Sequence, residues 1–236
     1  MAQQFRTEFM QIPIITRVYV TASILTTLAV QLSLVTPIQL LYHPQLVLRG
    51  ELWRLVTCFM FFGPVGISLV FNMLFLYRFC RKLEETSFAG NTAGFIIMLL
   101  FGASVTVIIG TVLVRMMFMG EALTTMLVYV WCRRNPFVRY SFFGLFTFQA
   151  PYLPWLLVLL SVLFGGSVVV DLVGIAVGHV YYFLEDVFPN KPGGFKILKT
   201  PAFLHRLCDG PQGDPDFVPP PEERPGGFAW GEGRQQ

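Results

Sequence analysis

The sequence predicts an all-α membrane protein, with six transmembrane helices within residues 1–187 and a polar tail over 188–236. Three observations support this fold class. Hydrophobic residues make up 54% of the chain and charged residues 13%, about half of the charged share of soluble domains. The apolar residues are gathered in long stretches between short polar connections. Basic residues cluster on alternate connections, as is typical of proteins that cross a membrane several times.

Six apolar stretches account for the predicted spans. Proline lacks a backbone donor and clashes with the preceding helical turn, so Gly63-Pro64 interrupts the second stretch. We therefore expect an interfacial helix over 52–62 before the second span. For the same reason, Pro151 and Pro154 confine regular helix in the fifth stretch to about its last dozen residues. The predicted spans are 18–35, 65–77, 94–114, 116–131, 142–164 and 168–183.

The basic residues predict the orientation of the chain. Clusters follow the second, fourth and sixth spans, whereas the opposite connections carry fewer basic residues. The positive-inside rule then places both termini in the cytosol. The tail is too rich in proline, glycine and acid to bury a core, so we expect it to be largely disordered. The three clusters are Arg78, Arg81 and Lys82, then Arg133, Arg134 and Arg139, then Lys191, Lys196 and Lys199.

Composition also argues against several classes of site. The formal net charge is +3 and the basic residues are scattered, which does not favour a nucleic-acid-binding protein. The four cysteines and three histidines lack the spacing of a metal site, and no pair of cysteines faces the oxidising side. We therefore expect no disulfide, no metal and no cofactor.

Polar and small residues inside the spans mark faces that turn away from lipid. Ser23 and Thr27 suggest that one face of the first span turns toward protein or water. In the sixth span, Gly174 and Gly178 lie four residues apart on one helix face, where a neighbouring helix can approach closely. Asp171 projects from roughly the same face. An ionisable residue within a span suggests a functional site; the alternative is a carboxylate hydrated at the membrane interface.

A second carboxylate, Glu121, follows Gly120 near the start of the fourth span. The fourth and sixth spans run in the same direction, so Glu121 and Asp171 should lie at similar depth. We expect them to share a hydrophilic pocket open toward the non-cytosolic side, suited to acid–base chemistry or to lining a water-filled groove. The fourth and fifth spans are shorter than the ~20 residues that a bilayer needs. Local thinning of the bilayer and burial of short helices in the bundle both remain open.

Several motifs taken together resemble the Derlin family, the rhomboid-like pseudoproteases of the endoplasmic reticulum. The motifs cover nearly the whole chain and are most similar to the derlin-two and derlin-three branch. The resemblance implies a six-helix rhomboid-like bundle in the endoplasmic reticulum membrane. Rhomboid proteases carry a serine and a histidine where this chain has Gly120 and Asp171, which implies that it is not an enzyme. The motifs are Trp53-Arg54, TTMLVYVWCRRNP at 124–136, DLVGIAVGHVYYFLEDVFPN at 171–190 and PEERPGGFAWGEG at 221–233.

The resemblance further implies a role in endoplasmic-reticulum-associated degradation, which is ubiquitin-dependent and linked to the unfolded protein response. The protein would help misfolded clients to pass from the lumen to the cytosol, beside a membrane ubiquitin ligase complex and the valosin-containing AAA ATPase. Membrane lipids and a homo- or hetero-oligomer are further expected partners, and nucleic acid is not. An intramembrane protease and a small-solute channel or transporter remain as alternative functions.

The sequence suggests binding roles for two further segments, one after the first span and one in the tail. Trp53 and Arg54 should anchor the connection after the first span at the membrane interface, by stacking and contact with lipid headgroups. The end of the tail resembles the short SHP box that docks on the AAA ATPase, with two aromatic anchors and glycines that let a groove approach the backbone. Its residues are Phe228, Trp230, Gly231, Glu232 and Gly233.

Overall fold

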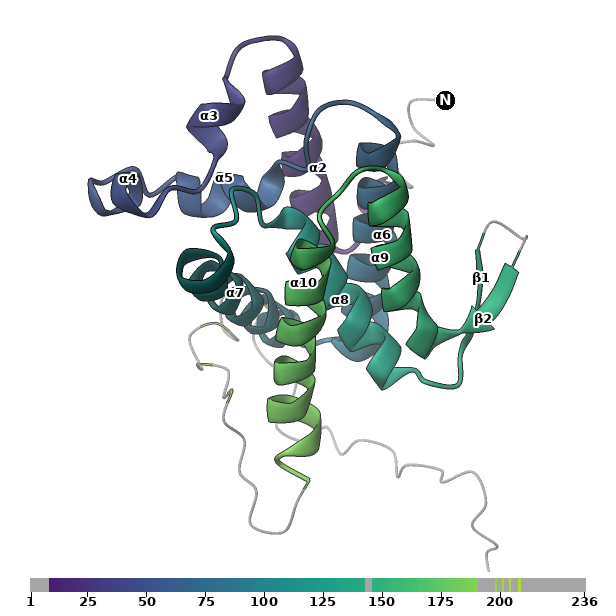
Figure 1. Cartoon of the computed structure of the whole chain (residues 1–236). Coiled ribbons are helices and arrows are strands. Elements are labelled where there is room, and N and C mark those ends of the chain that lie inside the picture. Colours follow the sequence, from purple (N-terminus) through teal and green to yellow (C-terminus); the bar gives the residue numbers. More distant parts are fainter. Residues whose placement is uncertain are drawn as a thin grey trace, which may run out of the picture.

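The computed structural model describes residues 9–142 and 146–190, together with the isolated positions 198, 201, 204 and 208. Helices dominate this part of the chain, and the strands in it form one antiparallel hairpin (Figure 1). The main helices are α2 (Ile14–Gln31), α3 (Pro37–Leu40), α4 (Pro44–Leu48), α5 (Arg54–Met60), α6 (Ile67–Lys82), α7 (Thr92–Ile109), α8 (Gly120–Arg134), α9 (Leu153–Leu163) and α10 (Val168–Tyr182). Shorter turns are η1 (Leu83–Ser87), η2 (Gly110–Val114), η3 (Ala150–Tyr152) and η4 (Phe183–Val187), and the strands are β1 (Arg139–Phe142) and β2 (Phe146–Gln149).

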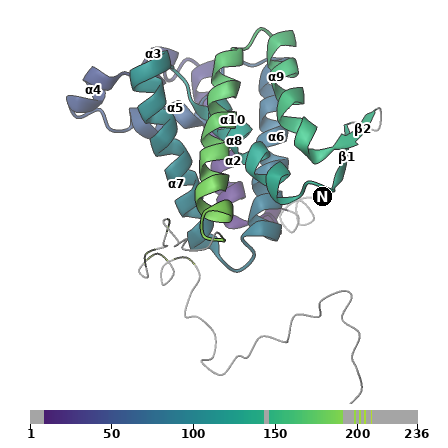
Figure 2. The same cartoon turned by 60° about the horizontal axis from the view of Figure 1, so that its bottom comes forward.

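Helix α8 forms the centre of the bundle. Most of its 15 residues are buried, and α5, α6, α7, α9 and α10 all pack against it. Figures 1 and 2 show α10 lying along α8, with α7 on one side and α6 and α9 on the other. Helices α3, α4 and α5 extend sideways from this bundle and form an arm beside α2 and α7. The charged residues of α8 lie at its two ends, with Glu121 in the first turn and Arg133 and Arg134 in the last, so the buried middle of the helix is uncharged.

The outer surface is that of a membrane bundle. Three helices are long and apolar enough to cross a membrane, namely Ile14–Gln31, Thr92–Val114 and Val168–Val187, and Ala150–Leu163 is a shorter apolar helix. In α2 the leucines Leu25 and Leu28 are exposed, whereas Ser23 and Thr27 are buried and donate hydrogen bonds to carbonyls one turn earlier. This inside-out polarity is what a helix needs when lipid replaces water around it. The predicted all-α polytopic bundle is confirmed.

Several helix ends differ from the predicted ones because tertiary partners set them. Helix α2 begins at Ile14 rather than at 18, because the Glu84 carboxylate accepts hydrogen bonds from its first backbone amides. Helix α6 continues through the basic residues that were expected to end it. Arg81 pairs with Glu85, and the Lys82 ammonium lies 4.3 Å from the centre of the Trp131 ring. The chain is thus held in helix where local composition favours an end.

Two features were not predicted. The connection 37–51 contains the short helices α3 and α4. The fifth stretch, predicted as 142–164, begins instead with the β1–β2 hairpin, in which Tyr140 pairs with Phe148 across the strands. Regular helix in this stretch is confined to Leu153–Leu163, as the prolines predicted. The fourth helix starts at Gly120 rather than at 116, since the Met119 amide bonds to the Cys58 carbonyl at 2.9 Å.

Candidate functional site

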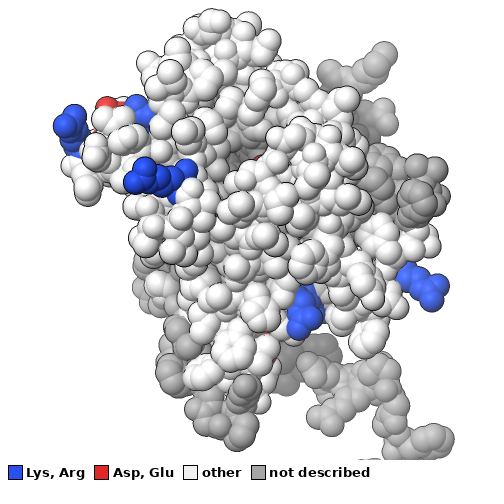
Figure 3. Space-filling model, viewed as in Figure 1, with Lys and Arg blue, Asp and Glu red and all other residues white. Residues whose placement is uncertain are grey.

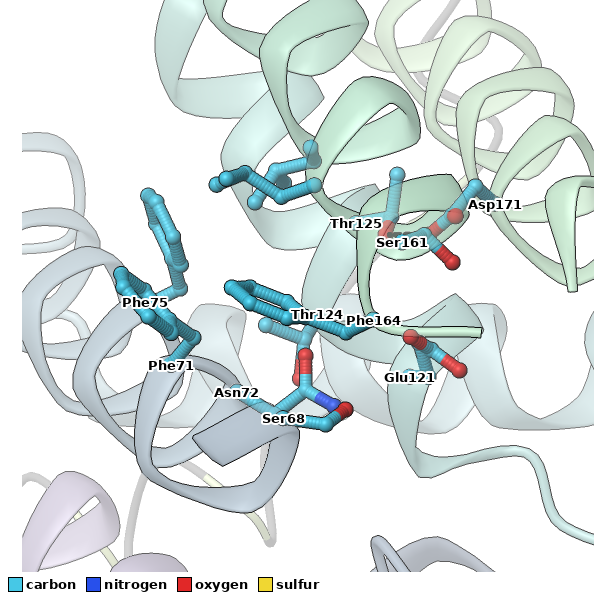
Figure 4. A pocket seen from close by; sticks show the side chains of 12 residues that line it. Ser68, Phe71, Asn72, Phe75, Glu121, Thr124, Thr125, Ser161, Phe164 and Asp171 are labelled. Atoms are coloured by element: carbon cyan, nitrogen blue, oxygen red, sulfur yellow. Dashed lines mark hydrogen bonds between the residues drawn. The ribbon is translucent and has the colours of Figure 1, made fainter. Parts of the chain in front are cut away.

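A polar cavity lies inside the bundle, between helices α6, α8, α9 and α10 (Figure 4). Its volume is about 20 Å³, which is room for a single water molecule. Figure 3 shows a hollow in the face that α10 forms, with an acidic side chain at its floor and uncharged residues around it. The cavity is lined by Ser68, Phe71, Asn72 and Phe75 of α6, Glu121, Thr124 and Thr125 of α8, Leu157, Leu160, Ser161 and Phe164 of α9, and Asp171 of α10.

Asp171 is placed in this cavity by the first turn of α10. Its exposed fraction is 2%, and its Oδ1 atom accepts a hydrogen bond from the Thr125 hydroxyl at 3.0 Å. Its Oδ2 atom is buried and has no hydrogen-bond partner in the described structure. The carboxyl group therefore lies inside the bundle and not on its outer surface.

The two glycines of α10 allow this close approach. A Cβ atom on Gly174 would lie less than 3 Å from the carbonyl oxygen of Ala122, and one on Gly178 would lie 2.9 Å from the Tyr129 ring. Both glycines therefore face α8, on the side of the helix that carries Asp171. Without them, α10 would be displaced and the Asp171–Thr125 hydrogen bond would lengthen.

Glu121 and Ser161 continue the polar lining. Glu121 is half-buried in the first turn of α8, and the Ser161 hydroxyl is buried. Ser161 lies close to both carboxyl groups but forms a well-aligned hydrogen bond with neither. Asn72 approaches Glu121 from α6. No lysine, arginine or histidine is found among the residues that line the cavity.

The same polar side chains thus reach across the bundle, from Asn72 through Glu121 and Ser161 to Asp171 and Thr125 (Figure 4). Water in the cavity could bond to the free oxygens of Ser161 and Asp171. We call these five residues the polar row. Sequence analysis identified Glu121 and Asp171 and missed the other three, although Asn72 and Ser161 are polar interruptions of apolar helices.

Gly120 precedes the polar row and has no room for a side chain. A Cβ atom there would lie 2.6 Å from the carbonyl oxygen of Phe59 and 3.0 Å from the Phe62 ring. His179 lies two turns beyond Asp171 on α10, where its Nδ1 atom and the Tyr129 hydroxyl share a hydrogen bond of 2.7 Å. It does not line the cavity. Hydroxyl groups and a histidine base are therefore not brought together among the residues around the polar row.

Two phenylalanines close one wall of the cavity. The rings of Phe71 on α6 and Phe164 at the end of α9 stack with their centres 5.0 Å apart and an interplanar angle of 24°. This stacked pair joins two helices that share few other contacts. A rotation of either ring would therefore open the cavity between α6 and α9.

The Trp53-Arg54 pair has two different environments. Trp53 is 55% exposed, on the outside of the arm. Arg54 is only 6% exposed, and its guanidinium donates to the carbonyls of Ile38 at 2.7 Å and Leu41 at 3.1 Å while pairing with Glu51. We expected both residues to contact lipid headgroups, but the structure places the Arg54 side chain inside the arm. The reason is that α3 ends in carbonyls that need a donor.

The remaining sequence-based assignments lie in the tail. Phe228, Trp230, Gly231, Glu232 and Gly233 fall outside the described residues. Their role stays a prediction.

Comparison with known families and with individual known proteins gives matches along most of the chain. Residues 12–202 match the sequence model of the Der1-like family. "Derlin-2.2" of Zea mays is 48% identical over 220 residues, covering 88% of this chain and 87% of that protein. "Probable derlin-2 homolog" of Dictyostelium discoideum is 41% identical over 217 residues, covering 89% and 85%. "Derlin-1.2" of Zea mays is 35% identical over 201 residues, covering 84% and 82%. The resemblance seen in the motifs is thereby confirmed, and this chain belongs to the Der1-like family.

Proposed function

We propose that this protein is a non-catalytic component of endoplasmic-reticulum-associated degradation, which helps misfolded lumenal and membrane proteins to pass into the cytosol. Membership of the Der1-like family supports this role. The observation that carries the proposal is the polar row, which gathers carboxyl, hydroxyl and amide groups inside the bundle, with no histidine among the residues that line the cavity. Polar side chains of this kind can hydrogen-bond to the backbone of a client chain.

The lengths of the neighbouring helices favour the same role. Helix α8 has 15 residues and α9 has 11, so at about 1.5 Å per residue they are about 22 Å and 16 Å long. A bilayer has a hydrocarbon core of about 30 Å. Helix α8 is buried at the centre of the bundle, so its short length needs no change in the bilayer. Helix α9 is short and exposes Trp155, Leu159 and Val162 on its outer side, which favours a thinned bilayer beside it. A thinner bilayer lowers the free energy of moving polar backbone through it.

The placement in the cell is part of the proposal. The basic residues at the ends of α6 and α8 would face the cytosol, and with them the N-terminus and the tail. The cavity would then open toward the lumen, where clients begin. A membrane ubiquitin ligase complex would modify the client, and the valosin-containing AAA ATPase would supply the energy.

A crosslinking experiment tests the role of the polar row. We would place a photo-reactive amino acid at position 161, inside the cavity, and as a control at position 25, where Leu25 is 60% exposed on α2. In microsomes that express a misfolded lumenal client, position 161 should crosslink to the client and position 25 should not. Equal crosslinking at both positions would contradict the proposal.

The tail provides a separate test. Phe228→Ala with Trp230→Ala should weaken binding of a peptide spanning 213–236 to the N-domain of the AAA ATPase by about a hundredfold, about 3 kcal/mol, since short motifs concentrate their binding energy in aromatic anchors. Phe217→Ala is a matched control, because it removes an aromatic ring outside the motif. Calorimetry measures all three peptides. If the double variant and the control bind equally, the tail does not dock through these residues.

The alternative functions make different predictions. An intramembrane protease should cleave model transmembrane substrates in purified form, and cleavage should disappear in Asp171→Ala. A solute channel should release small ions from vesicles. The cavity in the described chain holds about one water and is closed by Phe71 and Phe164, which offers a solute no passage.

A further inference from the structure

A second concavity lies on the outside of the bundle, away from the polar row. It has a volume of about 700 Å³ and runs between the end of α8, the start of α9 and the side of α10 from Leu172 to Val180. We call it the outer groove. Figure 1 shows how it arises, because α10 continues past the start of α9 while the chain before α9 turns aside into the hairpin. Pro151 and Pro154 shorten α9 here and leave the side of α10 uncovered.

The long wall of the groove is apolar. Leu172, Ala176 and Val180 form one stripe along α10, and Trp155 of α9 faces it with an exposed fraction of 59%. The stripe covers eight residue steps, about 12 Å at about 1.5 Å per residue. One leaflet of a bilayer contributes about 15 Å of the about 30 Å of hydrocarbon. The groove is therefore about as long as one leaflet is deep.

The polar groups of the groove are gathered at one end. Arg133, Tyr129 and His179 lie where α8 ends, and Tyr129 and His179 satisfy each other through their hydrogen bond of 2.7 Å. Arg133 is exposed, with its guanidinium 5.2 Å from the centre of the Tyr182 ring. In the part of the chain that the structure describes, Arg133 has no ion-pair partner, whereas its neighbour Arg134 binds Asp186 through two hydrogen bonds.

We propose that the outer groove binds one anionic phospholipid, with an acyl chain along α10 and the phosphate beside Arg133. A trough of this size with an apolar wall and few polar groups is typical of a small-molecule site. A single unpaired cation at the end of an apolar groove matches a molecule with one anionic end and a hydrocarbon body. Figure 3 shows few basic side chains on this face, and most of them lie apart from one another. The attraction for an anionic headgroup is therefore confined to the surroundings of single basic residues.

A packed helix of a partner protein fits the groove less well. Such a helix would bury Arg133 in an apolar contact, which requires a carboxylate at one position of the partner. A lipid leaves the guanidinium at the membrane surface with its phosphate. The inference does not depend on the proposed role in degradation, because it concerns a different face of the bundle.

Quenching of Trp155 fluorescence tests the proposal. The full chain is reconstituted in phosphatidylcholine vesicles that contain a small share of either dibrominated phosphatidylserine or dibrominated phosphatidylcholine. Subtracting the signal of Trp155→Phe isolates the emission of Trp155. We expect the brominated anionic lipid to quench Trp155 about fivefold more effectively than the zwitterionic one, as one basic residue near the headgroup predicts.

Variants of the groove separate the headgroup from the acyl chain. Arg133→Gln should remove the preference for the anionic lipid, while Arg139→Gln, an exposed arginine on the hairpin outside the groove, should retain it. Ala176→Phe should fill the groove and reduce quenching by both lipids. Equal quenching by both lipids in the unmodified protein would overturn the proposal. Protection of Trp155 from both lipids would also overturn it, in favour of a protein partner or a second copy of the chain.

Discussion

Replacing Glu84 by alanine should unfold the bundle more readily, although this residue lies 69 positions from the helix that it caps. Glu84 is 8% exposed in η1, and its carboxylate accepts hydrogen bonds from the amides of Ile15 and Thr16 at 3.0 and 2.9 Å and from the Thr16 hydroxyl at 2.7 Å. Pro13, which precedes α2, provides no side-chain cap of its own. A single carboxylate thus accepts hydrogen bonds from the free backbone amides at the start of α2 and joins this helix to the end of α6.

The size of the effect follows from these three bonds. A hydrogen bond to a charged group contributes about 1.5 to 3 kcal/mol, so three at the lower value give about 4.5 kcal/mol. A negative charge at a helix N-terminus adds a further contribution of about 0.3 to 1 kcal/mol. Glu84→Gln keeps one acceptor oxygen and should lose roughly half as much. Thr16→Val removes only the bond from the hydroxyl to the carboxylate, about 1.5 kcal/mol.

The free energy of unfolding can be measured by titrating the purified protein from mild detergent into SDS. Glu85→Ala is the matched control, since Glu85 is the adjacent acid and its ion pair with Arg81 is exposed. The control should lose at most about 0.5 kcal/mol. Two results would refute the reasoning. One is an equal loss for Glu84→Ala and Glu85→Ala, and the other is full additivity of Glu84→Ala and Thr16→Val, since partners in one network should couple.

Three further predictions use the same preparation. Gly174→Ala should push α10 away from α8 and lower the free energy of unfolding by about 1 to 3 kcal/mol. Gly66→Ala should change it by less than about 0.5 kcal/mol, because the added Cβ atom would come no nearer than 4.0 Å to another atom, the carbonyl oxygen of Pro64. If both variants lose the same, the α8–α10 contact is not tight. Arg54→Ala should leave the carbonyls of Ile38 and Leu41 without their donor. Backbone amides at 37–51 should then exchange their hydrogens faster than in the unmodified protein, while those of α7 change little. Unchanged exchange rates at 37–51 would contradict this. Arg134→Lys should cost about 1 to 2 kcal/mol because lysine cannot reproduce the two bonds to Asp186, and a silent substitution would show that the pair contributes no stability.

The fold class could be predicted from the sequence because it follows directly from the length of the apolar runs and the polarity of the segments between them. The third and sixth spans were predicted as 94–114 and 168–183, and the structure has helix over 92–114 and 168–187. A continuous apolar run has one stable arrangement in a bilayer, since its backbone must satisfy itself. The end of α6 was misplaced because Arg81 and Lys82 have partners that no local pattern shows. The hairpin was missed because the run FFGLFTF at 142–148, within which it turns, is as apolar and aromatic as the start of a span.

The candidate site likewise contains residues that the sequence could predict and residues that it could not. Glu121, Asp171 and the two glycines could be recognised from the sequence because ionisable and small residues stand out in an apolar run. Ser161 and Asn72 could not, since an ordinary polar residue faces the interior or a carbonyl one turn away depending on how its helix is rotated. The rotation of α10 relative to α8 is set by packing at Gly174 and Gly178.

The sequence by itself determined that this chain crosses a membrane, where its apolar segments lie, and which carboxylates are out of place there. Only the tertiary structure decided that Glu84 caps α2, that Arg54 holds the arm from within, and that Arg134 is the arginine paired with Asp186. The physical reason is that insertion of a segment into the membrane depends on the length and composition of that segment, which are local properties. A hydrogen bond depends on where two distant side chains meet, and that is known only after the helices have packed.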